Sequence, residues 1–399
     1  MSKKKKLIPE LRFPEFENEG EWEVDIVDNL VSTITPPRKL TSSDYQKDGK
    51  FPIIDQSKSF YCGWTNDVDA VIKDDLPLII FGDHTCILKI TNKPFVQGAD
   101  GIKILKTKNK VIPEFLYQYL QYNEVKQEDY KRHFSILKEK SVLFPKKESG
   151  EQQKIASCLS SLDDLISNHS QKLDLLKDHK KGLMQNLFPQ EGEKVPKLRF
   201  KEFEKDGEWV KKSLEEVATI LKGKGISKAD IVEDGELPCI RYGELYTHYN
   251  ETISTVKSYT NSSPKDLILS KANDVIIPAS GETQIDIAKA SCVLESGVAL
   301  GGDLNIIRSK INGVFLSYYL NNAKKHDIAQ MAQGIAVVHL YPNQLKTLKL
   351  QIPNPKEQQK IALCLSSLDA LITTQTEKIE QLNLHKKGLM QGLFPKIED

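Results

Sequence analysis

Two stretches of the chain carry apolar residues that repeat every seven positions, at alternating spacings of four and three. The repeating positions are Ile155, Leu159, Leu162, Ile166, Leu173, Leu176 and Leu183 in the first stretch, and Ile361, Leu365, Leu368, Ile372, Ile379, Leu382 and Leu389 in the second. This spacing places a narrow apolar stripe along a helix, as in the seam of a coiled coil. Each stretch ends at a Phe-Pro pair, and proline cannot continue a helix. We therefore predict long helices within 150–189 and 356–399.

Polar residues interrupt both stripes at matching places. His169 and Lys180 in the first stretch correspond to Gln375 and Lys386 in the second. A polar seam residue fixes register and partner at some cost in stability. The pattern alone leaves open whether each helix pairs with another subunit, with a second copy or with its own repeat. We predict an intramolecular antiparallel pair, which would place a folded segment at each end of helices about 55 Å long.

The chain is an internal repeat with constant ends and different middles. The motif Leu-Arg-Phe-x-x-Phe…Gly-x-Trp, which begins at Leu11, returns at Leu198. The motif Glu-Gln-Gln-Lys-Ile-Ala, which begins at Glu151, returns at Glu357. The displacement is larger for the second motif than for the first, so the two intervening segments differ in length. We interpret this pattern as one scaffold that carries two different binding domains.

The intervening segments have the pattern of mixed α/β domains. Short apolar runs at 78–81, 102–105, 274–277 and 304–307 predict strands, and the stretches 115–120 and 315–320 predict one helix in each segment. The predicted fold is two mixed α/β domains joined by two long helices that form an antiparallel coiled coil, with a pseudo-two-fold internal repeat. The predicted segments are a first domain at 1–149, its helix at 150–189, a linker at 190–197, a second domain at 198–355 and its helix at 356–399.

Amino-acid composition and missing motifs argue against a membrane protein, a metal protein and several classes of enzyme. With 39% hydrophobic and 28% charged residues, the 399-residue chain is typical of a soluble globular protein, and its longest apolar run is too short to span a membrane. The six cysteines form no C-x-x-C pair, which favours a reduced, cytoplasmic protein without a metal site. Phosphate-loop, dinucleotide, nucleophile-elbow, zinc-protease and adenine-methyltransferase motifs are missing from the sequence. A binding role is therefore favoured over a nuclease or methyltransferase activity of the chain itself.

The repeated motifs together resemble the DNA-specificity (S) subunit of Type I restriction–modification systems. The resemblance rests on the Glu-Gln-Gln-Lys-Ile-Ala helix starts, the Lys-Lys-Gly-Leu-Met-Gln-x-Leu-Phe-Pro helix ends and the Leu-Arg-Phe-x-x-Phe…Gly-x-Trp domain starts, and it covers nearly the whole chain. It implies a non-catalytic adapter for phage defence, with two target-recognition domains that each read half of a bipartite double-stranded DNA site. It also implies two methyltransferase (M) subunits and, in the full complex, restriction (R) subunits as partners. S-adenosylmethionine, ATP and Mg²⁺ would belong to those partners, so we expect no cofactor and no membrane contact in this chain.

Base contacts are expected from Arg, Lys, Asn or Gln in loops flanked by glycine or aromatic residues. The candidates are Gln56, Lys58, Ser59, Gln97, Arg132 and His133 in the first domain, and Lys224, Arg241, Tyr242, Gln284 and Gln333 in the second. Phosphate contacts are expected from the lysine-rich stretch 101–147, and the candidates there are Lys103, Lys106, Lys108 and Lys131. A competing interpretation is a structural scaffold whose domains grip peptides, which would show no salt-sensitive affinity for DNA.

Overall fold

The chain forms two compact units that share its two long helices. The computed structural model describes residues 7–99, 101–128, 132–334 and 337–396. The first unit comprises the chain up to Gln171 together with the chain from Glu377, and the second unit is Lys172–Thr376. Helix α4 (Glu151–Leu187) begins in the first unit and ends in the second, whereas α11 (Pro355–Leu393) begins in the second and ends in the first.

These units divide the chain differently from the predicted segments, which kept both helices apart from the domains. The difference arises because the ends of the helices are built into the cores of the units. Helix α11 also begins one residue before the predicted boundary, at Pro355. Proline is tolerated there because the first helical position needs no backbone N–H donor.

In its described residues, the first unit has short strands and three helices of its own. Its strands are β1 (Glu23–Ile26), β2 (Val31–Ile34), β3 (Phe51–Ile54), β4 (Gly63–Thr65), β5 (Val71–Ile72), β6 (Leu78–Gly82), β7 (Leu88–Thr91), β8 (Phe95–Gln97), β9 (Ile102–Thr107) and β10 (Ser141–Phe144). Its helices are α1 (Val27–Leu30), α2 (Pro113–Tyr122) and α3 (Phe134–Glu139), with 3₁₀ turns at Pro14–Phe16, Ser42–Asp44 and Lys147–Ser149. The strands form a β2-β9-β6-β7 sheet, a β4-β3-β8-β5 sheet and a β1-β10 pair.

The second unit repeats this plan with additional elements. Its strands are β11 (Val210–Ser213), β12 (Ala218–Lys222), β13 (Leu237–Ile240), β14 (Thr252–Ile253), β15 (Ser258–Thr260), β16 (Asp274–Pro278), β17 (Ser280–Gly281), β18 (Ser291–Val293), β19 (Ala299–Leu300), β20 (Leu304–Ser309), β21 (Val338–His339) and β22 (Lys349–Ile352). Its helices are α5 (Leu214–Val217), α6 (Tyr242–Thr247), α7 (Gln284–Ile287), α8 (Gly313–Asn321), α9 (Lys325–Met331) and α10 (Pro342–Lys346), with 3₁₀ turns at Lys201–Phe203, Lys228–Asp230 and Pro264–Asp266. The sheets are β12-β20-β16-β18-β14, β15-β13-β19, β17-β21 and β11-β22.

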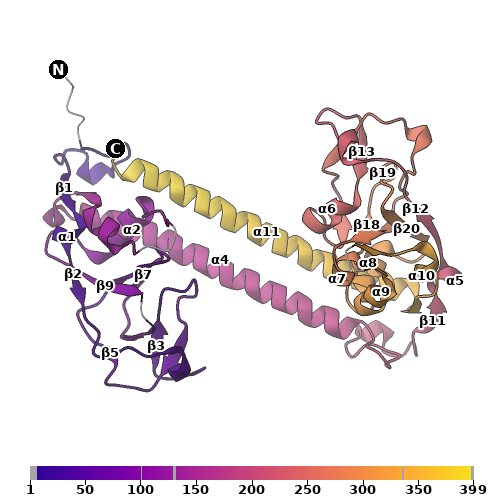
Figure 1. Cartoon of the computed structure of the whole chain (residues 1–399), viewed down its shortest axis with the longest axis horizontal. Helices are drawn as coiled ribbons and strands as arrows, with labels where there is room; N and C mark the ends of the chain where they lie inside the picture. The colour runs from indigo at the N-terminus through magenta and orange to yellow at the C-terminus, as the bar shows by residue number, and fades with distance from the viewer. Residues whose placement is uncertain (1–6, 100, 129–131, 335–336, 397–399) are drawn as a thin grey trace. The chain divides into compact units, whose positions relative to one another are not determined.

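The central strand of each unit has a continuous apolar sequence because both of its faces are buried. Every residue of β6 is buried, because Ile79 and Phe81 pack with α2 while Leu78 and Ile80 pack toward the second sheet. Strand β16 is buried in the same way between α8 and the β15-β13-β19 sheet. The strands and helices predicted at the six apolar stretches are therefore confirmed, and α2 and α8 lie against their sheets in Figure 1.

An arginine–glutamate fork joins each domain start to the start of a long helix. The Nε and Nη2 atoms of Arg12 donate to the two carboxylate oxygens of Glu151 at 2.8 and 2.6 Å. Arg199 makes the same fork to Glu357 at 2.8 and 2.8 Å. Both glutamate side chains are 1% exposed. In each repeat, the Leu-Arg-Phe motif thus supplies the arginine and the Glu-Gln-Gln motif supplies the glutamate of the same ion pair.

The glutamine that follows each of these glutamates holds the helix start to its domain. Gln152 accepts the backbone N–H of Ile112 at 2.9 Å and donates to the carbonyl of Pro145 at 2.7 Å. Gln358 accepts the backbone N–H of Asn312 at 2.9 Å, in the equivalent place before α8. The helix starts therefore have fixed positions on their own domains.

The Phe-Pro helix ends are core residues of the units. Phe394, after α11, packs within 5.8 Å of the ring of Phe115 in the first unit. Phe188, after α4, packs within 5.7 Å of the ring of Phe315 in the second. Each domain core is therefore completed by the helix end that the other repeat supplies.

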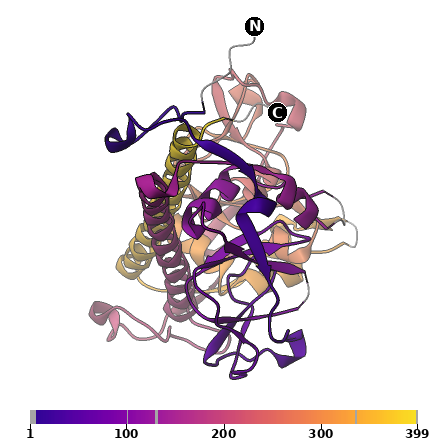
Figure 2. The same ribbon diagram turned by 90° about the vertical axis from the view of Figure 1, so that its left-hand side faces the viewer.

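Within each unit the two helices run antiparallel, as predicted. The first turns of α4, at Ile155 and Leu159, share a buried cluster with Met390 and Leu393 from the end of α11. Figures 1 and 2 show these two helix segments side by side in the first unit. In the second unit, Ile361 and Leu365 share a cluster with the end of α4. Every apolar seam position is buried or half-buried.

The two seam lysines meet carboxylates on the opposite helix. The Nζ atom of Lys386 lies 2.6 Å from Asp163, and that of Lys180 lies 2.7 Å from Asp369, so the two pairs occupy equivalent positions of the repeat. Burial alone would lower the pKa of Lys180, but Glu251 and Asp369 outweigh it and raise that pKa. The polar interruptions of the stripe therefore register one helix against the other.

We expect Glu357→Gln to lower the free energy of unfolding by about 3–5 kcal/mol, because it leaves the guanidinium of Arg199 buried without its counter-charge. The measurement is urea unfolding of the full chain. The matched control is Glu202→Gln, which removes an ion pair to Lys360 whose side chains are both 49% exposed, and its loss should be much smaller. Equal losses in the two variants would contradict the assigned importance of the fork.

Candidate nucleic-acid interface

The segment 55–61 follows β3 and carries two exposed candidates of the first domain. Lys58 and Ser59 are exposed, and Phe60 is 43% exposed beside them. The ring of Phe60 meets Tyr61 edge-on at 4.8 Å, and Tyr61 in turn lies 5.6 Å from Trp64. A lysine beside accessible aromatic rings can contact both phosphates and bases.

Gln56 lies in the same segment but is engaged inside the unit. Its Oε1 accepts the backbone N–H of His84 at 3.3 Å, and its carbonyl accepts the hydroxyl of Thr85 at 3.0 Å. A side chain at Gly101 would collide with Gln56, and the φ of +104° there also favours glycine. In this conformation Gln56 attaches the segment to His84 and Thr85 inside the unit.

Two further candidates of the first unit are buried. Gln97 is 3% exposed within β8, and His133 is 0% exposed. The ring of His133 accepts the backbone N–H of Glu128 at 2.9 Å through Nε2, and its Nδ1 lies 3.1 Å from the carbonyl of Asp83. Burial of both side chains argues against direct base contact, so Gln97 and His133 are packing residues here. Arg132, the neighbouring candidate, is exposed.

The candidate phosphate contacts have partners within the chain. Lys103 lies over the ring of Phe134 at 5.5 Å, and Lys108 donates to the carbonyl of Asp28 at 3.1 Å. Lys106 donates to Asp75 at 2.9 Å, which raises the pKa of the lysine. Lys131 lies outside the described residues. A phosphate would have to compete with these contacts, although Lys106 and Lys108 remain accessible.

One candidate of the second unit, Tyr242, lines a groove of about 770 Å³, and Gln284 and Gln333 are not among the residues that line it. Tyr242 lines this groove together with Tyr246, Lys289 and Lys325. Gln284 begins α7, which forms another wall, and Gln333 exchanges backbone hydrogen bonds of 2.9 and 2.7 Å with His339 of β21. Burial lowers the pKa of Lys289, and the neighbouring Lys325 lowers it further against the opposing effect of Glu251. The groove combines two tyrosines and two lysines, groups that recognise bases and phosphates, with the carboxylates of Glu282 and Asp286.

Arg241 is the N-cap residue of α6 and directly follows β13. Its backbone N–H donates to Glu244 at 2.8 Å, and its Nη2 lies 3.8 Å from the same carboxylate. The side chain is 27% exposed, and its Nε is buried without a hydrogen-bond partner among the described residues. Lys224, the remaining candidate, is exposed and is placed by a 3.0 Å hydrogen bond from its backbone N–H to the carbonyl of Leu300.

The segments 55–61 and 241–247 occupy equivalent places in the two units. Strand β3 pairs in parallel with β8, and β13 pairs in parallel with β19. Ile54 opposes Gln97 in the first pair, and Ile240 opposes Leu300 in the second. Asp55 and Arg241 are therefore the first residues after equivalent strand ends, so different side chains are presented at the same point of one fold.

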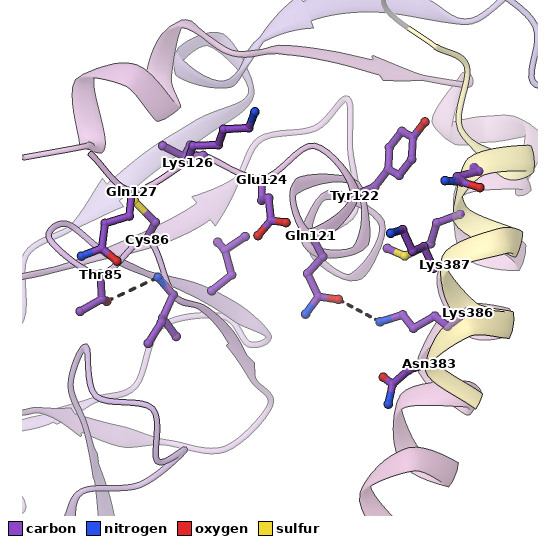
Figure 3. Close-up of a pocket in the computed structure, with 15 residues that line it drawn as sticks. Thr85, Cys86, Gln121, Tyr122, Glu124, Lys126, Gln127, Asn383, Lys386 and Lys387 are labelled. Carbon is purple, nitrogen blue, oxygen red and sulfur yellow. Dashed lines mark hydrogen bonds between the residues drawn. The ribbon is translucent and has the colours of Figure 1, made fainter. Parts of the chain in front are cut away.

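Sequence reasoning missed a basic groove of about 1000 Å³ in the first unit. It lies between the β6–β7 turn, the end of α2 and the last turns of α11 (Figure 3). Lys386 donates to Gln121 across it at 2.9 Å, and Lys126 and Lys387 also line it. No spacing signal could have revealed this groove, because one part of its wall lies within 85–127 and the other within 383–391.

The part of the chain that the structure describes contains no group of three or more His, Cys, Asp or Glu placed to hold a metal ion. None of the described helices is both long enough and apolar enough to cross a membrane.

The chain matches the family described as Type I restriction modification DNA specificity domain, over residues 19–178 and 206–384. These ranges cover most of the chain and follow its repeat, so the chain belongs to this family. It has the family's role of DNA sequence recognition, which is not catalytic.

Similar proteins and structures agree with this assignment. The MjaVIII specificity subunit of Methanocaldococcus jannaschii is 25% identical in an alignment of 417 positions, gaps included, that covers 96% of this chain and 93% of that protein. The EcoR124I/EcoR124II specificity subunit of Escherichia coli is 25% identical and is matched over 87% of each chain. The crystal structure of a Type I restriction–modification S subunit from M. genitalium has the same fold, with a TM-score of 0.67 at 15% identity, covering 98% of this chain and 100% of that one.

We expect Arg241→Ala to relax base preference at one or two adjacent positions, at a cost of about 1–3 kcal/mol for the best sequence. The measurement is selection from a random DNA pool by the assembled complex, followed by sequencing. Lys265→Ala, at an exposed lysine of the same unit, is the control. Equal relaxation throughout the selected sequence, or none, would remove Arg241 from the set of base-reading residues.

Proposed function

We propose that this chain selects a bipartite DNA site, with each domain reading one half, and that the paired helices set the distance between the halves. The observation that carries the proposal is the repeat itself. The order β2-β9-β6-β7 of the first unit returns as β12-β20-β16-β18 in the second, but the units present different residues at the equivalent segments 55–61 and 241–247. Two different readers on one scaffold would select two different half-sites.

The helices are also the proposed docking surface for two methyltransferase subunits. Large apolar side chains point outward from them, away from the seam. These are Leu165 (40% exposed), Leu175 (70%), Leu363 (53%), Leu371 (56%) and Leu384 (69%). These exposed leucines are the apolar side chains that a bound protein partner would cover. Leu165 and Leu371 occupy equivalent positions of the repeat, so two copies of the same partner would meet this leucine on each helix.

The chemistry in such a complex would come from its partners. Methyltransferase subunits would use S-adenosylmethionine to methylate an adenine in each half-site, and restriction subunits would use ATP and Mg²⁺. This chain would contribute recognition and assembly. All six cysteines are free thiols, in keeping with the reducing cytoplasm where cellular DNA is found.

The proposal is tested by co-expressing the chain with its candidate methyltransferase subunits and sequencing host DNA for methyladenine. We expect a new split motif with two short half-sites, a fixed gap and one modified adenine on each strand. The partner subunits expressed without this chain are the control. A stable complex that leaves the DNA unmethylated and shows no salt-sensitive DNA affinity would support the scaffold alternative instead.

A further inference from the structure

A buried lysine holds the backbone of segment 55–61 from inside the first unit. Lys89 lies in β7 and is 4% exposed. Its Nζ donates to the carbonyl oxygens of Asp55 at 2.9 Å, Ser59 at 2.6 Å and Phe60 at 3.4 Å. One ammonium group therefore ties together the two ends of the segment that displays Lys58 and Phe60.

A buried glutamate holds the equivalent segment of the second unit. Glu244 is 3% exposed, and its carboxylate accepts the backbone N–H of Arg241 at 2.8 Å. It also accepts the hydroxyl of Ser258 in β15, the strand beside β13. The start of α6, with Tyr242 at the rim of the groove, is thereby fixed to the sheet.

Burial of these charges has a free-energy cost that apolar residues would not incur. Burial lowers the pKa of Lys89, against the opposing effect of Asp55 and Cys62. A lysine whose only role was to fill the core could be replaced by methionine of similar size. Among the described residues, the hydrogen bonds of the Lys89 ammonium all go to segment 55–61. The free energy spent on burying this charge therefore goes into holding the backbone conformation of that segment.

We infer that Lys89 and Glu244 are positioning residues for base recognition, each fixing the segment through which its own domain reads DNA. This inference rests on the proposed function. A fixed segment offers its side chains to the base edges in one geometry, so only a matching sequence makes all the contacts. A loosened segment adapts to more sequences, which reduces discrimination more than it reduces overall binding.

The test uses matched pairs of variants in the full chain, assembled with the methyltransferase subunits. Lys89→Met and Glu244→Met remove the charges at similar side-chain length. Lys89→Arg and Glu244→Gln keep hydrogen-bonding groups at the same places and serve as conservative variants. Lys93→Met, at an exposed lysine just after β7, is the control for removing a lysine from the same domain.

The first readout is the methylated motif of host DNA. We expect Lys89→Met to make one half-site degenerate, with about tenfold weaker discrimination against a single mismatched base pair there, and to leave the other half intact. Glu244→Met should relax the opposite half. The conservative variants should recover much of the lost discrimination, and Lys93→Met should keep the parental motif. An unchanged motif in both methionine variants, or relaxation of both halves by either one, would overturn the inference.

The second readout separates this inference from the proposed function. Hydrogen exchange of the full chain without DNA should become about tenfold faster in 55–61 for Lys89→Met, and only there, as expected for loss of a charge-assisted hydrogen bond. Unchanged exchange would overturn the positioning role even if the complex methylates a split site. Faster exchange with no methylation by the parental complex would instead overturn the proposed function, and with it the recognition role of both residues.

Discussion

The buried fork between an arginine of the domain start and a glutamate of the helix start is the contact on which the rest of the structure depends. Arg12 and Glu151 are far apart in the sequence, as are Arg199 and Glu357, yet both pairs close in the same geometry. A carboxylate that is 1% exposed is stable as an ion only when it is fully paired, and a two-pronged arginine provides such pairing. The fork therefore determines where each long helix leaves its domain. With Gln152 and Gln358 beside the glutamates, the helix start becomes a rigid extension of the domain.

This anchoring allows the domains to differ while the scaffold stays the same. The helix starts are held by forks, the helix ends are held by Phe188 and Phe394 in aromatic cores, and the seam is registered by Lys180 and Lys386. These contacts use the residues that the two repeats share. The segments after β3 and β13 take no part in them, so their side chains can change without disturbing the helices. Variable recognition on a constant frame is what a DNA-specificity subunit requires.

Much of the fold could be predicted from the sequence because its signals are local. The seven-residue period revealed the helices, and the continuous apolar runs revealed the central strands. The site was less predictable because burial there depends on contacts between distant segments. In β7 the sequence Leu-Lys-Ile-Thr alternates as if Lys89 faced solvent, yet Lys89 is buried and the flanking Leu88 and Ile90 are half-buried. Gln97 and His133 have the residue types of base readers, but tertiary packing encloses them. Arg241, Tyr242 and Lys58 stay candidates by residue type and by their glycine or aromatic neighbours. Lys58 and Tyr242 are exposed, whereas Arg241 is half-buried.

The most direct test of the account replaces the second reader with a copy of the first. Strands β1 and β10 bound the first domain as β11 and β22 bound the second, so residues 23–144 can be inserted in place of 210–352 with the forks, helix ends and seam retained. The measurement is the methylated motif produced by the assembled complex. If each domain independently reads one half-site, the asymmetric motif will become an inverted repeat of a single half-site. Retention of the original asymmetric motif, or an assembled complex that methylates no site, would contradict the claim that two separate readers share one scaffold.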